Sequence, residues 1–313
     1  MATQLHVIFS KHFMGAGIIA GVPFACSDGN LAGATKCMLT PALETVFTYE
    51  RLVSSGALFG NVDSASSMAN DKIYIFAGTQ DSVVNPGNGK NIAKFYSHFI
   101  HNNGNIKEVF NVRAEHSMPT ENYGGSCDKL NSGSYLNNCG YNAAFELLNH
   151  IYGGNLQVNH IYGGNLQVNH IYGGNLQVNH IYGGNLQVNH IYGGNLQVNH
   201  IYGGNLQLLK FDQSEFFHLS PARKYGMDTT GYIYVPSGCM DKTRKCKLHV
   251  ALHGCEMGRT IIGEKYVRYA GYNEVGEANN IIILYPQAIK TLSNPNGCWD
   301  WWGYTGLYFG EYK

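Results

Sequence analysis

Residues 71–119 contain the pattern that most restricts how this chain can fold. A run of β-branched and aromatic residues precedes Asp81, and a second apolar run precedes His116. The segment between them, 88–101, carries apolar residues at helical spacing. Because a strand–helix–strand unit forms a parallel pair with a right-handed crossover, we expect Asp81 and His116 at the same carboxyl edge of a sheet.

The order of these two residues matches one known arrangement of catalytic groups. In α/β-hydrolases the nucleophile, the acid and the base follow one another as Ser, then Asp or Glu, then His. We therefore expect Asp81 to orient the imidazole of His116, which would act as general base. The chain contains no Gly-x-Ser-x-Gly motif, and Ser54-Ser55-Gly56 follows a helical run and lacks the first glycine. The nucleophile of such a triad is therefore missing from this sequence.

A third polar loop is expected at the same sheet edge. His253, Gly254 and Cys255 directly follow a predicted strand over 247–252. In many α/β-hydrolases a His-Gly loop after a strand supplies an oxyanion-hole N–H, because glycine lets the backbone turn its donor toward the substrate. We expect His253 and Gly254 to contact substrate. The alternative is an ordinary tight turn between a strand and a helix.

The tryptophans near the carboxyl terminus are a second candidate substrate surface. Trp299, Trp301 and Trp302 are the three tryptophans of the chain, and six aromatic residues lie between 299 and 309. Such a group can form an apolar wall for an acyl or polymer chain, or it can belong to the core. We assign substrate binding to Trp299 and Trp302.

Composition narrows the class of partner. The 21 basic and 21 acidic residues balance, which argues against nucleic acid or an anionic membrane surface as a partner. No apolar run approaches the ~20 residues that a membrane-spanning helix needs. The first ten residues lack the basic start and long apolar stretch of a signal peptide and resemble the middle of an amphipathic helix.

The eight cysteines indicate disulfide bonds and an oxidising compartment, because six of them form sequence-near pairs in Gly-, Ser- and Asn-rich loops. Proximity favours Cys26–Cys37, Cys127–Cys139, Cys239–Cys246 and Cys255–Cys298. Buried free thiols are the alternative. A zinc site is disfavoured, because no C-x-x-C pair occurs.

The remaining periodicity predicts helices and strands on both sides of an insertion. We expect helices over 2–13, 41–53, 141–151 and 258–280, and strands over 15–21, 231–236, 247–252 and 281–286. The continuous apolar run of 281–286 is typical of a strand inside a parallel sheet. We expect one domain in two parts, 1–150 and 208–313, separated by the insertion 151–207.

The insertion is a tandem repeat. Ile-Tyr-Gly-Gly-Asn-Leu-Gln-Val-Asn-His occurs five times without change over 151–200, and a sixth copy breaks after Gln207. Removing 151–200 leaves a seamless join with one copy, so we expect a surface or disordered insertion. Stacked hairpins are an alternative, because Gly-Gly-Asn is a turn signal. Weak metal binding by the evenly spaced histidines from His150 to His200 is another.

Several blocks of the chain resemble one enzyme family. They are Gly78-Thr-Gln-Asp81-Ser-Val-Val, Glu115-His116-Ser-Met-Pro, Leu252-His-Gly-Cys-Glu256, Gly271-Tyr-Asn, Leu284-Tyr-Pro-Gln and Gly297-Cys-Trp-Asp-Trp-Trp302. Together they span nearly the whole chain except 151–200 and resemble the extracellular poly(3-hydroxybutyrate) depolymerases of the single-domain, circularly permuted type. The resemblance implies an α/β-hydrolase-like three-layer sandwich with a mostly parallel sheet. In that family a Gly-x-Ser-Ser-Gly elbow precedes a helix that begins like Met1-Ala-Thr-Gln-Leu-His-Val, so we expect an amino-terminally truncated fragment that lacks the elbow strand.

The same resemblance implies a role for each candidate residue. Asp81 is the expected triad acid, His116 the base, and the backbone N–H of Cys255 an oxyanion donor. The implied protein is a secreted, extracellular serine esterase that cleaves poly- or oligo-(3-hydroxybutyrate) esters. It is expected to act as a monomer on a polymeric or oligomeric ester substrate, with no metal or organic cofactor.

Without the nucleophile and a central strand, the chain as written is expected to be inactive and its sheet to have two exposed ladder edges. Two alternative functions remain open. One is a catalytically dead homologue that acts at most as a binding protein. The other is a surface or interaction protein in which the repeat is the working part.

Overall fold

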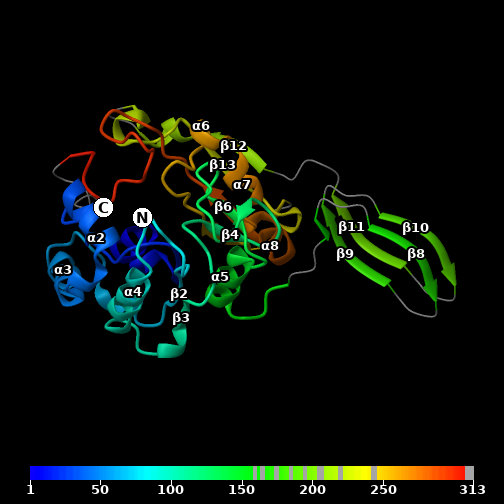
Figure 1. Ribbon diagram of the computed structural model, residues 1–313, viewed down its shortest axis with the longest axis horizontal. Helices are drawn as coiled ribbons and strands as arrows, with labels where there is room; N and C mark the ends of the chain where they lie inside the picture. Colours follow the sequence, from blue (N-terminus) through cyan, green and yellow to red (C-terminus); the bar gives the residue numbers. More distant parts are fainter. Residues whose placement is uncertain are drawn as a thin grey trace.

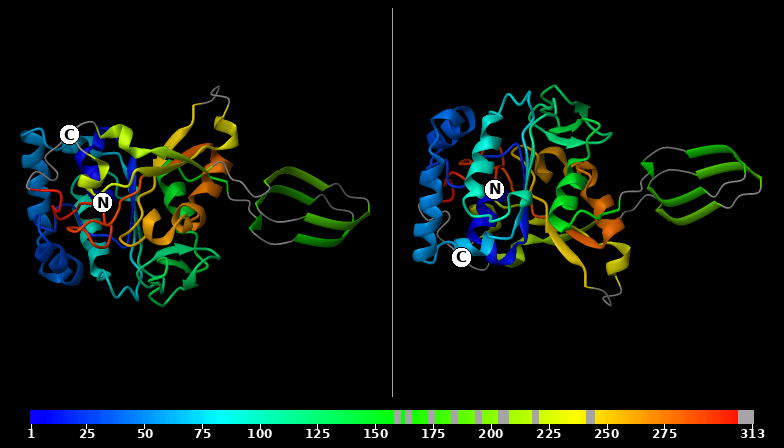
Figure 2. Two further views of the ribbon diagram at one scale, coloured as in Figure 1. Left: turned by 90° about the horizontal axis from the view of Figure 1, so that it is seen from above. Right: turned by 90° about the horizontal axis from the view of Figure 1, so that it is seen from below.

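The computed structural model describes residues 1–157, 161–162, 166–172, 176–182, 186–192, 196–202, 208–217, 221–240 and 245–306. Its helices are α1 (Ala2–Ile8), α2 (Leu31–Leu39), α3 (Val46–Leu58), α4 (Gly87–Ser97), α5 (Ala143–Tyr152), α6 (Arg259–Ile262), α7 (Lys265–Tyr269) and α8 (Tyr272–Asn279). The strands outside the repeat are β1 (Gly15–Ile19), β2 (Lys72–Phe76), β3 (Ile106–Val109), β4 (Met118–Thr120), β5 (Gly125–Ser126), β6 (Leu136–Asn138), β12 (Leu208–Asp212), β13 (Thr230–Tyr234), β14 (Lys247–Val250) and β15 (Ile281–Tyr285). These elements form an α/β body, and the strands of the repeat project from it to one side (Figures 1 and 2).

Strand β2 is buried on both faces and lies at the centre of the amino-terminal half of the body. It pairs in parallel with β1 on one side and β3 on the other. Because successive side chains of a strand point to opposite faces, Ile73 and Ile75 belong to one apolar cluster and Tyr74 and Phe76 to another. Residues of α3 and α4 complete the first cluster, and residues of α5 contribute to the second. The result is the expected α/β order of helix, sheet and helix.

The carboxyl-terminal half has a second sheet, in the order β12-β13-β15-β14. β15 pairs in parallel with β14 and antiparallel with β13, which in turn pairs antiparallel with β12. Ile281, Ile283 and Tyr285 are buried and alternate with half-buried neighbours, so β15 turns one face toward the core. The strand predicted over 281–286 therefore lies inside its sheet, between β13 and β14.

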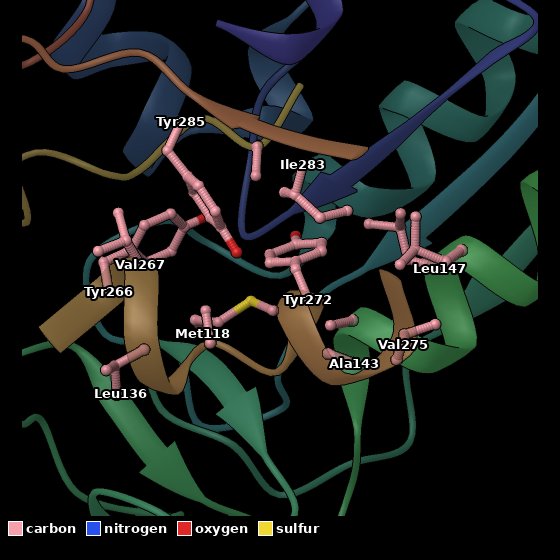
Figure 3. Packing of buried hydrophobic residues seen from close by; sticks show 14 of the residues in the cluster. Met118, Leu136, Ala143, Leu147, Tyr266, Val267, Tyr272, Val275, Ile283 and Tyr285 are labelled. Carbon is pink, nitrogen blue, oxygen red and sulfur yellow. The ribbon is translucent and has the colours of Figure 1, made fainter. Parts of the chain in front are cut away.

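The two sheets share a core but do not pair with each other. Phe76 of the first sheet and Ile283 of the second belong to the same apolar cluster, which Leu147 of α5 and Tyr272 and Val275 of α8 extend (Figure 3). Within the described residues, β1 and β14 are terminal strands of their sheets and pair on one side only. The sheet of this α/β fold is thus divided into two parts, each with an open edge.

The segment 258–280 differs from the single helix that its periodicity predicts. It forms α6, α7 and α8, with breaks at Gly263 and Gly271. These glycines have φ angles of +65° and +91°, which lie outside the range of a right-handed helix. The apolar spacing continues through the breaks, because all three short helices turn residues toward one core.

Four disulfides close loops of the body. They are Cys26–Cys37, Cys127–Cys139, Cys239–Cys246 and Cys255–Cys298, the same pairs that sequence proximity favours. All eight cysteines of the chain are therefore in disulfides. Such use of cysteine fits an oxidising compartment.

The described residues of the repeat form strands that project from the body, and these strands are not the stacked hairpins considered as an alternative. The strands are β7 (Ile161–Tyr162), β8 (Leu166–Tyr172), β9 (Leu176–Tyr182), β10 (Leu186–Tyr192) and β11 (Leu196–Tyr202). Each pairs in parallel with the strand two copies away, so that β10 lies beside β8 and β9 lies between β7 and β11. Hairpins would pair consecutive copies in antiparallel fashion. Alternate copies instead enter two separate sheets.

Deletion of residues 151–200 should leave the α/β body folded. Ile151 is buried in the core and the Tyr152 hydroxyl donates to the carbonyl of Leu248, and the join supplies Ile201 and Tyr202 in their places. We expect one cooperative transition with a Tm within about 3 °C of the parent, which corresponds to less than about 1 kcal/mol. Differential scanning calorimetry measures it. Loss of the cooperative transition would show that the body needs the repeat.

Glu274 is a buried carboxyl group whose ionisation should make the stability of the protein depend on pH. It is 6% exposed, its Oε2 has no hydrogen-bond partner among the described residues, and burial raises its pKa to about 7. Because this folded-state pKa lies above the ordinary carboxyl value, the folded state loses stability as pH rises from about 4.5 to about 7. Glu274→Gln should therefore stabilise the protein by about 1–3 kcal/mol at pH 8 and have little effect at pH 4.

Urea denaturation at both pH values measures this effect. Glu277→Gln is the matched control on the same helix, because Glu277 accepts hydrogen bonds from the Tyr234 hydroxyl and from Ser237. This control should destabilise the protein at pH 8. If Glu274→Gln changed the free energy of unfolding equally at pH 4 and pH 8, ionisation of the Glu274 carboxyl would not destabilise the folded state.

Candidate active site

Asp81 lies in the loop after β2, and backbone groups hold its carboxylate. Its Oδ1 accepts hydrogen bonds from the N–H groups of Val83 (2.9 Å) and Val84 (2.7 Å). Gly78 lets this loop approach the next one, since a Cβ there would lie 2.2 Å from the carbonyl oxygen of Ala114. These contacts fix the orientation of the Asp81 carboxylate, including that of its second oxygen, Oδ2.

His116 meets this oxygen at the end of the next strand. Its Nδ1 lies 2.9 Å from Oδ2 of Asp81, and the two side chains are 25% and 2% exposed. A buried carboxylate on Nδ1 keeps the proton on that nitrogen, which leaves Nε2 as the proton acceptor. Within the described residues, Nε2 has no hydrogen-bond partner. The structure thus brings the two predicted residues together in the geometry that a general base and its orienting acid require.

Glu115 links the loops that carry this pair, and the sequence patterns did not single it out. One of its carboxylate oxygens accepts hydrogen bonds from the N–H groups of Ser82 (2.6 Å) and His116 (2.8 Å). Burial acts to raise the pKa of Glu115, but these hydrogen bonds and the neighbouring His116 hold it below its usual value. Its position directly before the histidine was the available signal.

Both ring nitrogens of His253 hydrogen-bond within the protein itself. Its Nε2 accepts a hydrogen bond from the N–H of Ala288 (3.0 Å), and its Nδ1 donates to the carbonyl oxygen of Gly254 (2.7 Å). The residue is 2% exposed, and burial lowers its pKa to about 4. His253 is therefore a neutral imidazole that supports the loop. Gly254 and Cys255 remain exposed.

The backbone N–H of Cys255 is available to an external acceptor. It donates to no other described residue. Two connections hold the loop around it: the disulfide to Cys298, and a hydrogen bond from the N–H of Glu256 to the carbonyl of Asn296 (2.7 Å). A fixed, unpaired N–H beside a sheet edge is the donor that an oxyanion needs.

A hydrogen bond across the site shows that the histidine loop and the Cys255 loop are neighbours. The Tyr135 hydroxyl donates to Oε2 of Glu256 (2.9 Å), and the ring of Tyr135 meets that of His116 edge to face, with centroids 6.2 Å apart. Tyr135 and Glu256 both have left-handed backbones, with φ of 54° and 61°. Non-glycine residues in this region are often found at functional sites. No sequence pattern pointed to this pair.

The tryptophans occupy different positions around these loops. The indole N–H of Trp299 donates to the carbonyl of His253 (2.8 Å), so Trp299 supports the loop that carries His253 and Cys255. The carbonyl of Trp301 accepts from the hydroxyl of the fully buried Ser27 (2.6 Å), which joins this segment to the loop after β1. Trp302 is partly exposed and packs against Trp301 and Tyr304. Of the two predicted substrate contacts, Trp302 is the less constrained.

The described part of the chain offers neither a metal-binding cluster nor a membrane-spanning helix. It contains no group of three or more His, Cys, Asp or Glu side chains placed to hold a metal ion. The side chains of the histidines from His160 to His200 lie outside the described residues, and so does the metal binding considered for them, whereas Nε2 of His150 bonds to the carbonyl of Asn105 (2.8 Å). In the described segments, no helix is long and apolar enough to cross a membrane.

Comparison with known proteins relates the whole chain to one enzyme family, although no protein-family model matches it. A poly(3-hydroxybutyrate) depolymerase of Delftia acidovorans is 34% identical over 314 residues, which cover 99% of this chain and 54% of that protein. A polyhydroxybutyrate depolymerase of Talaromyces funiculosus is 32% identical over 323 residues, which cover 98% of this chain and 79% of that protein. The chain belongs to the polyhydroxybutyrate depolymerase family. It spans about half the length of the Delftia relative.

Solved structures of the family agree with the fold. A serine-to-alanine variant of a PHB depolymerase, complexed with an R3HB trimer, has a TM-score of 0.77 at 31% identity over 99% of this chain and 86% of that one. A PHB depolymerase from Penicillium funiculosum has a TM-score of 0.75 at 30% identity over 98% of this chain and 85% of that one. The expected family and fold class are thereby confirmed.

Two substitutions at His253 should separate its hydrogen bonds from its titration. His253→Leu leaves the buried N–H of Ala288 unpaired and should cost about 1–3 kcal/mol at pH 7. His253→Gln keeps an acceptor and should cost less. Because the folded-state pKa of about 4 lies below the ordinary value of 6.5, the unfolded chain takes up a proton first, and stability falls as pH drops from 6.5 to 4. His253→Gln should weaken that fall.

Urea denaturation at pH 7 and pH 4.5 measures both effects. His249→Gln is the control for titration alone, because burial also lowers the pKa of His249 to about 4. Equal losses for His253→Leu and His253→Gln at pH 7 would contradict the hydrogen-bond assignment.

Proposed function

We propose that this protein is a carboxylic ester hydrolase that cleaves poly- or oligo-(3-hydroxybutyrate) esters through a Ser-His-Asp mechanism. The observation that carries the proposal is the pair Asp81–His116, with a 2.9 Å hydrogen bond and an open Nε2 on the histidine. The N–H of Cys255 lies on the loop that Tyr135 joins to the histidine side. Base and oxyanion donor thus belong to one site.

The nucleophile in this proposal is a serine outside these 313 residues. Ser117, next to the pair, is engaged elsewhere, because its hydroxyl donates to the carbonyl of Glu115 (3.0 Å). The open edges of β1 and β14 offer a place for a strand between the two sheets. A strand–turn–helix elbow inserted there would present its serine at the sheet edge where the other groups lie.

Each group then has a definite step. The serine attacks the ester carbonyl, and Nε2 of His116 takes its proton while Asp81 stabilises the imidazolium. The Cys255 N–H stabilises the oxyanion, and the protonated His116 donates to the leaving alcohol. Water activated by His116 then releases the acid from the acyl-enzyme. His253, Trp299 and Glu115 position these groups, and Trp302 lines the path of the polymer.

The substrate class indicates where, relative to the cell, the reaction takes place. A water-insoluble polyester cannot enter a cell, so we place the enzyme outside the cell, where four disulfides persist. The substrate is a polymeric or oligomeric 3-hydroxybutyrate ester. The proposed steps need no metal or organic cofactor.

The test is active-site labelling of the gene product isolated from its source. A fluorophosphonate reacts with base-activated serines, and peptide mass spectrometry locates the labelled residue. Hydrolysis and binding of an (R)-3-hydroxybutyrate trimer are measured in parallel. We expect one labelled serine outside the present sequence, and we expect Asp81→Asn to lower kcat by about 10⁴ while trimer binding is kept.

Other outcomes would overturn parts of this proposal. A labelled serine within these residues would refute the assignment of the nucleophile. Hydrolysis that persists in His116→Gln would refute the base. Trimer binding with neither labelling nor hydrolysis would favour the binding-protein alternative, which the missing serine motif supports.

A further inference from the structure

The strands of the repeat pair with copies of themselves, residue on residue. In the pair β8–β10, Leu186 lies opposite Leu166 and Tyr192 opposite Tyr172. The pair β9–β11 has the same register. Because the decapeptide copies are identical, any further strand of this sequence meets the same partner that each strand already has.

The array ends in two full-length strand edges. β10 and β11 are the outermost strands of the two repeat sheets and pair, among the described residues, on one side only. An unpaired strand edge presents a row of backbone N–H and C=O groups to a further strand. Natural proteins block such edges with charged residues or proline. The segment 151–207 contains no Asp, Glu, Lys, Arg or Pro.

The edges are therefore unprotected, uncharged and self-complementary. No charge repulsion within the repeat opposes the approach of a second copy. A partner of another sequence would have to reproduce the spacing that a second copy has by identity. These properties favour a second copy of this chain as the occupant.

The position of the α/β body decides how two copies can meet. The repeat strands run outward from the body, which lies at one end of them (Figures 1 and 2). Three stacked strands advance by about 14 Å, whereas a body of this size is roughly 45 Å across. Parallel stacking of arrays would bring the bodies to the same end and force them to overlap. Antiparallel pairing places them at opposite ends.

We propose that the repeat is a dimerisation surface, through which two copies of this chain pair edge to edge and antiparallel along β10 and β11. The arrangement has two-fold symmetry and is closed, so it stops at two copies. It replaces the monomer expected from the sequence and is independent of the proposed catalytic steps. A register centred on Asn189 places this residue opposite the partner's Asn189.

Sedimentation equilibrium of the full chain tests the proposal. We expect a species of twice the 34.5 kDa chain mass and a monomer after deletion of 151–200. The repeat also supplies a matched pair of substitutions in identical local sequence. Asn189→Lys with Asn199→Lys puts charge on the outer strands, and Asn179→Lys puts the same charge on β9, which lies between two strands.

The outer substitutions should raise the dissociation constant of the dimer at least about tenfold, because like charges then face each other. Asn179→Lys should leave the dimer intact, and circular dichroism checks that both variants keep their strands. A monomer at all concentrations would overturn the proposal, as would a dimer that survives deletion of 151–200. Fibres or larger oligomers would overturn the closed antiparallel arrangement.

Discussion

Burial of β2 on both faces is the constraint on which the amino-terminal half depends. Ile73 and Ile75 fill the core under α3 and α4, and Tyr74 and Phe76 fill the core shared with α5. A strand covered on both faces has little freedom of register, because a slip by one residue would exchange the two sets. The ends of β2 and β3 are therefore placed accurately. Asp81 and His116 lie just beyond these ends.

The loop that carries Cys255 is positioned by a different kind of interaction. No continuous sheet joins β14 to β1 within the described residues. The loop at Cys255 is held by polar contacts: the ring of His253 bonds to the backbone of Ala288 and Gly254, and Trp299 donates to the carbonyl of His253. Such bonds are strong only while they are shielded from water. The buried His253 ring meets that condition, and the hydrogen bond from Tyr135 to Glu256 links the two sides of the site.

The repeat and the body show two ways in which one sequence specifies structure. In the body, each apolar residue has one place in a shared core, and a strand finds its partner through packing. In the repeat, every strand has equivalent partners, so pairing is defined by the backbone and by identity of sequence. The first mechanism specifies a unique chain fold. The second leaves strand edges open within the described residues.

Local patterns predicted the elements that carry chemistry, but not the residues that hold them in place. The loops with Asp81, His116 and Cys255 follow strands that their apolar runs indicated. Glu115 and the Tyr135–Glu256 bond escaped notice, because a residue gains such a role only when two distant loops meet. The hydrogen bonds by which His253 supports its loop escaped notice for the same reason, because its partner Ala288 is 35 residues away.

By itself, then, the sequence determined the alternation of strands and helices, the order of acid and base, the three sequence-near cysteine pairs and the absence of a Gly-x-Ser-x-Gly motif, since each depends on near neighbours along the chain. The tertiary structure alone decided three other features. It divided the sheet into two parts, broke 258–280 at Gly263 and Gly271, and paired the repeat strands two copies apart. The physical reason is that packing and backbone pairing between distant segments outweigh local preferences wherever those preferences are weak.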